Sequence, residues 1–254
     1  FLSLLAALLG MFTKEITFTL PLMILLYEFF FFRRDKRLNW RYILPFFILL
    51  VAIAIWIYFG KLIKFQEITR IAKPPSVPHY LFTQIRVLAT YLRLVFLPIN
   101  QNLLYDYPIS QSLWELPTLT NLLLLIAIFI LGIKLFSKYR LLSFSIFWFF
   151  ISLSVESSII PIRDVIFEHR LYLPMLGFSL FLISSLFLIL TGKSRLTLIL
   201  TLILTLIAAY SILTYKRNFI WKDELTLWND VVGKFSPKTE VLIESLKPPL
   251  ADYT

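Results

Sequence analysis

Acidic and basic side chains gather in one short segment of this otherwise apolar chain. Between two long apolar runs, residues 156–174 hold six of them: Glu156, Arg163, Asp164, Glu168, His169 and Arg170. A charge at the centre of a membrane helix costs about 2.5–3.5 kcal/mol on insertion scales. We therefore expect this cluster to lie at a water boundary or to line a polar cavity, and it is the first candidate for a binding or catalytic site.

Cations of this kind suit an anionic ligand. Phosphate has dense negative charge, so ammonium, imidazolium and guanidinium groups are its usual partners. We expect His169 and Arg170 to hold a phosphate or diphosphate, with Glu168 or Glu156 fixing them by hydrogen bonds. The structural alternative is that Glu168 helps to cap a helix and that Arg170 only reaches lipid headgroups.

Basic residues outside the cluster are candidates for the same anion site. Lys14 lies between two apolar runs, where we expect it to pair with a phosphate. Its neighbour Glu15 either orients Lys14 or helps to bind a divalent cation; the alternative is a turn with a local ion pair. Arg86 and Arg93 lie on one polar stripe of a helix expected over 80–97 and extend the site. The supporting polar residues are Glu15, Glu156, Arg163, Asp164 and Glu168.

A metal centre is not expected at this site. His169 and His79 are the only histidines and are far apart in sequence, without HxxxH or HxH spacing. The chain has no cysteine, which excludes disulfides, thiol catalysis and thiolate metal sites. It also has no phosphate-cradling glycine motif and no Gly-x-Ser-x-Gly element, so a P-loop and a serine hydrolase are not supported.

Composition places the chain among membrane proteins. Of its 254 residues 59% are hydrophobic, and the apolar residues fall in long blocks. The formal charge of +10 does not indicate nucleic-acid binding, because the basic residues flank apolar runs, where topology and membrane lipids explain them.

The apolar blocks predict an all-α fold, a polytopic transmembrane bundle of about seven crossings. The first run begins at Phe1 and spans only about 18 Å as a helix, whereas a bilayer core needs about 30 Å. We therefore expect the first helix to be truncated and the chain to be a piece of a longer protein. The expected helices lie near 1–12, 16–32, 42–60, 119–136, 140–156, 171–191 and 196–214.

The charge of the connecting segments predicts the orientation. Residues 33–41, 134–140 and 193–195 together hold ten basic residues and one acid, which places them on the cytoplasmic side. The acid-bearing loop 100–118, the cluster and the C-terminal tail then lie outside. In this arrangement the helix over 80–97 does not cross; it lies along the external surface or dips in, with its arginines facing a polar cavity. The alternative is an interfacial helix whose arginines touch headgroups.

A second region is expected after Tyr215. Trp221, Leu225, Trp228 and Val232 recur at helical spacing among polar residues, which predicts a short external amphipathic helix. The expected organisation is thus a membrane domain over 1–215, followed by this helix and a tail over 216–254.

Several motifs together resemble a known family over about residues 1–236. The chain is similar to the membrane half of bacterial tetratricopeptide-repeat (TPR) membrane proteins, which resemble the animal transmembrane-and-TPR O-mannosyltransferases. Those belong to the GT-C type glycosyltransferases, which use polyprenyl-linked sugars. The motifs are Thr13-Lys14-Glu15-Ile16, Asp106-Tyr107-Pro108, Glu156-Ser-Ser-Ile-Ile-Pro161, Phe167-Glu-His-Arg-Leu-Tyr-Leu-Pro174 and Trp221-Lys-Asp-Glu-Leu-Thr-Leu-Trp228.

The resemblance implies a bacterial plasma-membrane enzyme with an external active site. Its donor would be a polyprenyl-phosphate sugar and its acceptor a protein or glycan. Lys14, His169 and Arg170 would then bind the donor phosphate, and Asp106 and Tyr107 would contact acceptor or sugar, although a plain turn also explains those two residues. The catalytic acid of the family is expected upstream of Phe1, and TPR helices after the tail. A divalent cation is the one cofactor left open.

Two other classes of function stay open. The first is a non-catalytic membrane anchor that displays a TPR scaffold. The second is a lipid or glycan transporter, which would predict paired broken helices in two related halves; the sequence shows no such symmetry.

Overall fold

The computed structural model describes residues 2–32, 38–64, 75–155, 157, 161 and 164–234. These residues form helices and connecting loops and include no strand, so the expected all-helical fold is confirmed for this part of the chain. The α-helices are α1 (Leu2–Thr13), α2 (Leu20–Tyr27), α3 (Trp40–Lys64), α4 (Val77–Phe96), α5 (Leu116–Leu135), α6 (Arg140–Leu153), α7 (Pro174–Ile189), α8 (Arg195–Asn218) and α9 (Glu224–Val232).

Among the described residues, four shorter helical turns adjoin three of these helices, α2, α7 and α8. A 3-10 turn (Glu15–Thr19) leads into α2, and a π-helical turn (Glu28–Phe32) ends it. Another 3-10 turn (Phe219–Trp221) follows α8. The 3-10 turn Glu168–Leu171 precedes α7 and contains the Glu-His-Arg motif.

Helix α6 forms the centre of the packing. Nine of its residues are buried, and it lies against α2, α5 and α7. At Gly177 of α7, an added Cβ would lie 2.7 Å from the Ser145 carbonyl oxygen of α6, so the two backbones meet there without an intervening side chain. The hydroxyl of Ser143 donates to the carbonyl of Gly132 at 2.6 Å and joins α6 to α5. Small residues therefore determine how closely these three helices pack.

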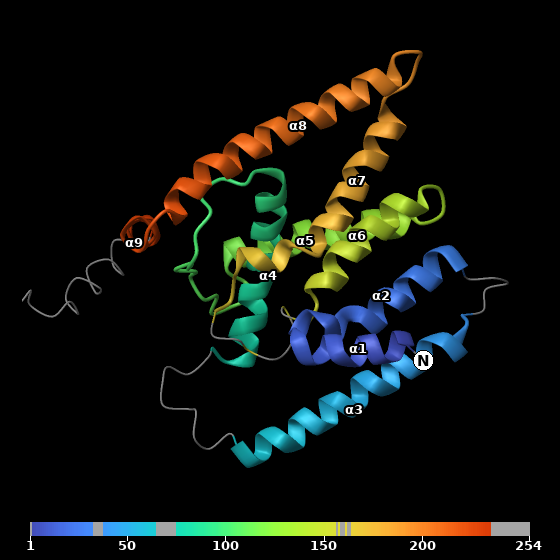
Figure 1. Ribbon diagram of the computed structural model, residues 1–254, viewed down its shortest axis with the longest axis vertical. Helices are drawn as coiled ribbons and strands as arrows, with labels where there is room; N and C mark the ends of the chain where they lie inside the picture. The colour runs from blue at the N-terminus through green and yellow to red at the C-terminus, as the bar shows by residue number, and fades with distance from the viewer. Residues whose placement is uncertain are drawn as a thin grey trace, which may run out of the picture.

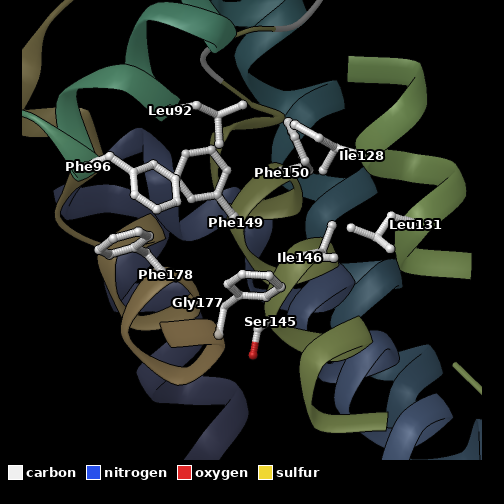
Figure 2. Close-up of a pocket in the computed structure, with 11 residues that line it drawn as sticks. Leu92, Phe96, Ile128, Leu131, Ser145, Ile146, Phe149, Phe150, Gly177 and Phe178 are labelled. Carbon is white, nitrogen blue, oxygen red and sulfur yellow. The ribbon is translucent and has the colours of Figure 1, made fainter. Parts of the chain in front are cut away.

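An apolar cavity of about 170 Å³ remains between α4, α5, α6 and α7. Figure 2 shows Phe96 and Phe178 approaching it from one side and Ile128 and Leu131 from the other. The rings of Phe96 and Phe178 meet edge to face, with their centroids 4.8 Å apart. The lining is almost wholly aromatic and aliphatic, so this cavity is a packing feature with little for a polar ligand to bind.

The molecule has two chemically different ends, which lie at opposite sides of Figure 1. At the right of the view lie the end of α2, the start of α3 and the turns that follow α5 and α7. We call this the basic end, because the turns around 134–140 and 190–195 contain five basic residues and no acid. The opposite end, which we call the polar end, comprises α4, the loop after it, residues 164–173 and α9.

Two helices of the described residues are long and apolar enough to cross a membrane: Leu116–Leu135 and the helical stretch Arg195–Trp221. The apolar helices α1, α6 and α7 are shorter; the 14 residues of α6, for example, extend only about 21 Å. The seven expected crossings are therefore not established by helix length and composition. Helix α8 is almost entirely exposed, and its apolar side chains face outward all round.

Helix α4 differs from the membrane spans in its pattern. It is amphipathic, with Tyr80, Val87 and Tyr91 fully buried on one side, and it is not among the helices that could cross a membrane. Two polar residues of the same helix, Thr83 and Gln84, are also buried. A helix with this pattern packs along a protein surface. The expected position of the segment 80–97 along the external face of a membrane stays a prediction.

The C-terminal elements shift the expected boundary. Helix α8 continues to Asn218, so the boundary expected near Tyr215 falls inside a helix. Asp223 caps α9, because its side chain accepts a hydrogen bond from the backbone N–H of Thr226 at 2.8 Å. The short amphipathic helix expected after Trp221 is present as α9, and the tail from residue 235 onward lies outside the described residues.

Candidate functional site

Residues 11–14 and 167–170, which are far apart in sequence, meet in one open pocket of the polar end. Its volume is about 460 Å³. Lys14 contributes one wall and His169 and Arg170 the other, so three of the predicted phosphate-binding residues share a pocket. The complete lining consists of Met11, Phe12, Thr13, Lys14, Phe167, His169 and Arg170.

The end of α1 presents Lys14 to this pocket. The hydroxyl of Thr13 donates to the Gly10 carbonyl at 2.7 Å and closes the last turn of the helix. Lys14 then adopts an extended backbone, with φ −152° and ψ 138°, before the next helical turn begins at Glu15. Because the helix stops at this residue, the Lys14 side chain is exposed at the pocket wall.

The opposite wall is an extended, non-helical segment held by a tyrosine of α4. The hydroxyl of Tyr91 donates to the carbonyl of Phe167 at 3.1 Å and accepts from the backbone N–H of the same residue at 3.0 Å. Tyr91 itself is fully buried. Both hydrogen bonds fix the backbone immediately before the Glu-His-Arg turn.

The Glu-His-Arg motif lies on this turn and not at the start of a long helix. We expected the next helix to begin at Leu171, but α7 begins at Pro174. Proline has no backbone N–H and a fixed φ, so it suits the first turn of a helix and is poorly placed inside one. As a result, residues 168–171 form a separate 3-10 turn whose side chains point in different directions.

Arg170 is buried and held by backbone carbonyls. Only 6% of the residue is exposed. Its guanidinium group donates to the carbonyls of Asp164 at 3.3 Å and Val165 at 3.4 Å, and it lies 5.2 Å from the ring centroid of Phe167. The Val165 carbonyl also accepts from the buried side chain of Gln84 at 2.9 Å. These contacts position Arg170, which contributes a fixed positive charge behind the pocket wall.

His169 is the exposed member of the motif. Its imidazole stacks on the ring of Phe167, with the centroids 5.2 Å apart. Partial burial lowers the pKa of His169, and the positive charges of Lys14 and Arg170 lower it further. The imidazole is therefore neutral at neutral pH, with one nitrogen that donates a hydrogen bond and one that accepts.

Glu168 turns away from the two cations. Its carboxylate accepts a hydrogen bond from the backbone N–H of Asn102 at 2.7 Å and a short one from the hydroxyl of Tyr105. Burial raises the pKa of Tyr105, and the hydrogen bond to Glu168 raises it further, so the phenol remains a donor. Glu168 thus connects the motif to the loop after α4. Among the described residues, its carboxylate neither accepts a hydrogen bond from Arg170 nor caps a helix.

The two arginines of α4 serve the same loop. Arg86 donates to the Pro108 carbonyl and to the Ser110 hydroxyl, both at 3.1 Å, and Arg93 donates to the Ile99 carbonyl at 3.1 Å. Neither arginine is among the residues that line the Lys14 pocket. The structure therefore does not bring them together with Lys14, His169 and Arg170.

The predicted acceptor-contact residues lie on that loop. Arg86 also lies 5.4 Å from the ring of Tyr107, whose hydroxyl shares a 2.9 Å hydrogen bond with Thr90. Burial raises the pKa of Tyr107, against the hydrogen bond with Thr90 and the charge of Arg86, which lower it. Asp106 is exposed. Tyr107 is thus engaged in packing the loop on α4, and neither residue lines the pocket.

The remaining predicted residues are only partly described. Asp164 is exposed, and its backbone carbonyl accepts the hydrogen bond from Arg170. Glu156, Arg163 and the side chain of Glu15 lie outside the described residues. Among the residues that are described, no three His, Asp or Glu side chains gather in a way that could hold a metal ion.

Four polar residues that position the site were not predicted from the sequence: Gln84, Tyr91, Asn102 and Tyr105. Gln84 offered one signal, because it is an uncharged amide on the apolar side of an amphipathic helix. Its Oε1 and the Oδ1 of Asn102 are buried without a hydrogen-bond partner among the described residues. Such buried amides are rare, and they usually belong to a functional or closely packed region.

Comparisons of this chain with protein-family models, with curated proteins and with solved structures found no match. The interpretation of the site therefore depends on its geometry and on the motifs of the sequence.

Proposed function

We propose that this chain belongs to a membrane glycosyltransferase that takes a sugar from a polyprenyl-phosphate donor and transfers it to a protein or glycan. One observation supports this proposal above the others. Lys14 and the Phe167–Arg170 segment, distant in sequence, line one open pocket and give it two positive charges. A phosphate group is the natural ligand of such a pocket.

The chemistry follows from where charge develops. In the transfer, the bond between the anomeric carbon and the donor phosphate oxygen breaks, and the acceptor oxygen forms a bond to that carbon. The leaving phosphate gains negative charge, which Lys14 stabilises directly and Arg170 through its fixed charge. The neutral His169 donates a hydrogen bond to the same group.

The acceptor proton must pass to a general base. The described residues that line the pocket include no carboxylate. His169 has an unprotonated nitrogen at neutral pH, but it faces the two cations that would hold the leaving group. We therefore assign the Lys14 pocket to donor binding and place the base outside it.

The membrane arrangement is part of the proposal. We propose a bundle of about seven crossings in a bacterial plasma membrane, with the polar end outside and the basic end in the cytoplasm. Two helices of sufficient length and hydropathy support membrane association. The separation of the five basic residues of the α5–α6 and α7–α8 turns from the Lys14 pocket supports the orientation.

Lys14 is the residue for the decisive experiment, because it is exposed and its replacement leaves the packing intact. The full-length protein is reconstituted in vesicles with a polyprenyl-phosphate sugar, and transfer to acceptor is measured. We expect Lys14→Ala to lower turnover by about a hundredfold, the usual effect of removing one charge-stabilising donor. Lys14→Arg keeps the charge and should retain most of the activity.

Lys222→Ala provides the control, since Lys222 is also an exposed lysine of the polar end but does not line the pocket. Wild-type turnover in Lys14→Ala would remove the pocket from the mechanism and overturn the proposal.

A membrane anchor for a protein-interaction region is the second candidate, and the attachment of α9 favours it. Asp230 of α9 forms 2.6 Å ion pairs with Arg217 and Lys234. Lys234 also donates to the Gln101 carbonyl at 2.7 Å. Because these contacts fix α9 to the rest of the protein, α9 could hold a protein-interaction region that follows it in a constant orientation. Absence of transfer with every polyprenyl-phosphate sugar, for the wild-type protein, would favour this candidate.

A further inference from the structure

We propose that a second pocket, at the basic end, binds an anionic phospholipid. This pocket has a volume of about 390 Å³ and lies where the start of α6 meets the last turns of α7. Tyr139 and Arg140 line its polar side, and Ile183, Phe187 and Leu188 line its apolar side. The proposal rests on the membrane arrangement proposed above and does not depend on sugar transfer at the Lys14 pocket, since the two pockets share no lining residue.

One arginine lines the polar side of this pocket, and further basic residues lie in the turns next to it. Arg140 belongs to the lining, and its guanidinium group lies 5.8 Å from the ring of Phe136. From the next turn, Arg195 reaches over the ring of Phe187, a lining residue, at 5.2 Å. The two turns, 134–140 and 190–195, also contain Lys134, Lys138 and Lys193 and no acidic residue.

Neither arginine forms an ion pair within the described residues; both rest on aromatic rings. A guanidinium group stacked on a ring keeps its donors available at the ring edge. A phosphate placed between Arg140 and Arg195 would therefore gain two charge-assisted partners without displacing an internal one.

The apolar side of the pocket identifies the ligand as a lipid and not a soluble anion. Ile183, Phe187 and Leu188 are 39%, 40% and 45% exposed; Phe187 lies next to Arg195, and Ile183 is one helical turn further from it along α7. A free phosphate would leave this wall uncovered. An acyl chain attached to the phosphate would cover it, because burial of apolar area is favourable at about 25 cal/mol per Å².

Basic pockets between helices at the cytoplasmic face are suited to anionic lipid headgroups. Phosphatidylglycerol has the chemistry required, with one phosphodiester charge above two acyl chains. Phosphatidylcholine has the same chains and phosphate, but its ammonium group cancels the net charge. The two lipids therefore separate the contribution of charge from that of the chains.

The experiment uses the purified full-length protein in a neutral detergent, with native mass spectrometry or fluorescence titration of added lipid. We expect phosphatidylglycerol to bind more tightly than phosphatidylcholine. Each arginine should contribute about fivefold, the usual effect of one basic residue at an anionic membrane surface. Arg140→Ala/Arg195→Ala should then weaken phosphatidylglycerol binding by about 25-fold and leave phosphatidylcholine binding unchanged.

A second variant tests the apolar wall without changing charge. Ile183→Trp fills the pocket from an exposed position and should weaken binding of both lipids. Lys222→Ala removes one positive charge from the polar end and should bind both lipids as the wild-type protein does. Circular dichroism of each variant verifies that its helical content is unchanged.

Three results would overturn the proposal. The first is equal binding of the two lipids by the wild-type protein. The second is unchanged phosphatidylglycerol binding in the double arginine variant. The third is displacement of the lipid by equimolar inorganic phosphate, which would assign the site to a soluble anion.

Discussion

Arginines at the two ends of this molecule are used in opposite ways. At the polar end Arg170 is 6% exposed, and two backbone carbonyls accept its hydrogen bonds. At the basic end Arg140 and Arg195 are exposed and lie on aromatic rings. The same side chain is thus a fixed structural element in one place and an adaptable surface group in the other.

This difference shows how the polar end is built. The Lys14 pocket depends on the extended segment 164–167, whose backbone N–H and C=O groups need hydrogen-bond partners because they are not paired within a helix. Tyr91, Gln84 and Arg170 all bond to the backbone of residues 164–167. At the basic end short turns join antiparallel helices, and the helices themselves hold the turns in place. The charge of Arg170 is therefore held in place by hydrogen bonds in a buried site, whereas the charges of Arg140 and Arg195 are exposed and rest on aromatic rings.

The largest expected effect is on stability, from Arg170→Ala. Removal of the buried guanidinium group takes away the donor to the Asp164 carbonyl and one of the two donors to the Val165 carbonyl, which keeps its bond from Gln84. We expect a loss of about 3 kcal/mol in the free energy of unfolding, typical of buried hydrogen bonds to a charged group. The equivalent change at the basic end, Arg140→Ala, should stay within about 0.5 kcal/mol. Denaturant unfolding in detergent measures both.

A similar cost for the two variants would contradict the comparison between the ends. It would mean that Arg140 has a structural role which its exposed position does not suggest.

The next effect contrasts two glycines. In Gly177→Ala the new Cβ would lie 2.7 Å from the Ser145 carbonyl oxygen and 3.1 Å from the Phe149 nitrogen, so α6 and α7 must separate. Overpacking of this kind costs about 2 kcal/mol. In Gly192→Ala the new Cβ meets nothing, but the residue has φ +97°, so the cost is backbone strain of about 1 kcal/mol.

Thermal unfolding of the two variants compares the cost of the α6–α7 clash in Gly177→Ala with the cost of backbone strain in Gly192→Ala. Equal destabilisation would show that the α6–α7 contact is less tight than the 2.7 Å approach implies.

The fold could be predicted largely from the sequence, because apolar runs and polar connections repeat at a helical scale. Seven of the expected helices coincide with α1, the α2 region, α3, α5, α6, α7 and α8. Helix length was less predictable: α6 ends at Leu153 and α7 begins at Pro174, each shorter than its apolar run. Hydropathy reports what the residues prefer to contact, and it does not report where the backbone leaves the helix.

The site was predicted in part, and the division has a physical reason. Lys14, His169 and Arg170 could be grouped because each is a basic residue in a short polar segment between two apolar runs. The roles of Arg86 and Glu168 could not be predicted, because they depend on the path of the loop 97–115, and the loop has no periodicity. The hydrogen bonds of this loop, from Arg86 to Ser110 and from Asn102 and Tyr105 to Glu168, follow only from the three-dimensional arrangement.

A smaller effect concerns the attachment of α9 to the polar end. Burial opposes ionisation of Asp230, but hydrogen bonds from Lys234 and Arg217 outweigh it and lower its pKa. Because the folded-state pKa is below the ordinary value, the attachment is present above about pH 4 and is lost as the pH falls through the folded-state pKa. Asp230→Asn should remove both ion pairs at every pH and weaken the attachment by about 1 kcal/mol.

Fluorescence of Trp228 on α9 reports the attachment, and proteolysis after Asn218 provides a second measurement. Glu224→Gln changes another acid of α9, one that is not a partner in the ion pairs of Asp230, and it should behave as the wild-type protein. An acid transition that persists in Asp230→Asn would assign the titration to a different group.

The smallest expected effect is the pH dependence of anion binding at the Lys14 pocket. His169 is mostly neutral in the free protein because burial and the charges of Lys14 and Arg170 lower its pKa. A bound phosphate favours the protonated imidazole, so it raises that pKa and binds more tightly as the pH falls below about 6.5. One additional charge at contact distance in water is worth about 1 kcal/mol, or about fivefold in affinity between pH 8 and pH 5.

The probe should be a short-chain polyprenyl phosphodiester, because its own charge is constant over this range. Lysine and arginine side chains also keep their charge there, so the profile reports His169. In His169→Gln the affinity should be independent of pH and equal to that of the wild-type protein at pH 8. A pH-independent wild-type profile would place the anion away from His169 and leave Lys14 as its only exposed partner in the pocket.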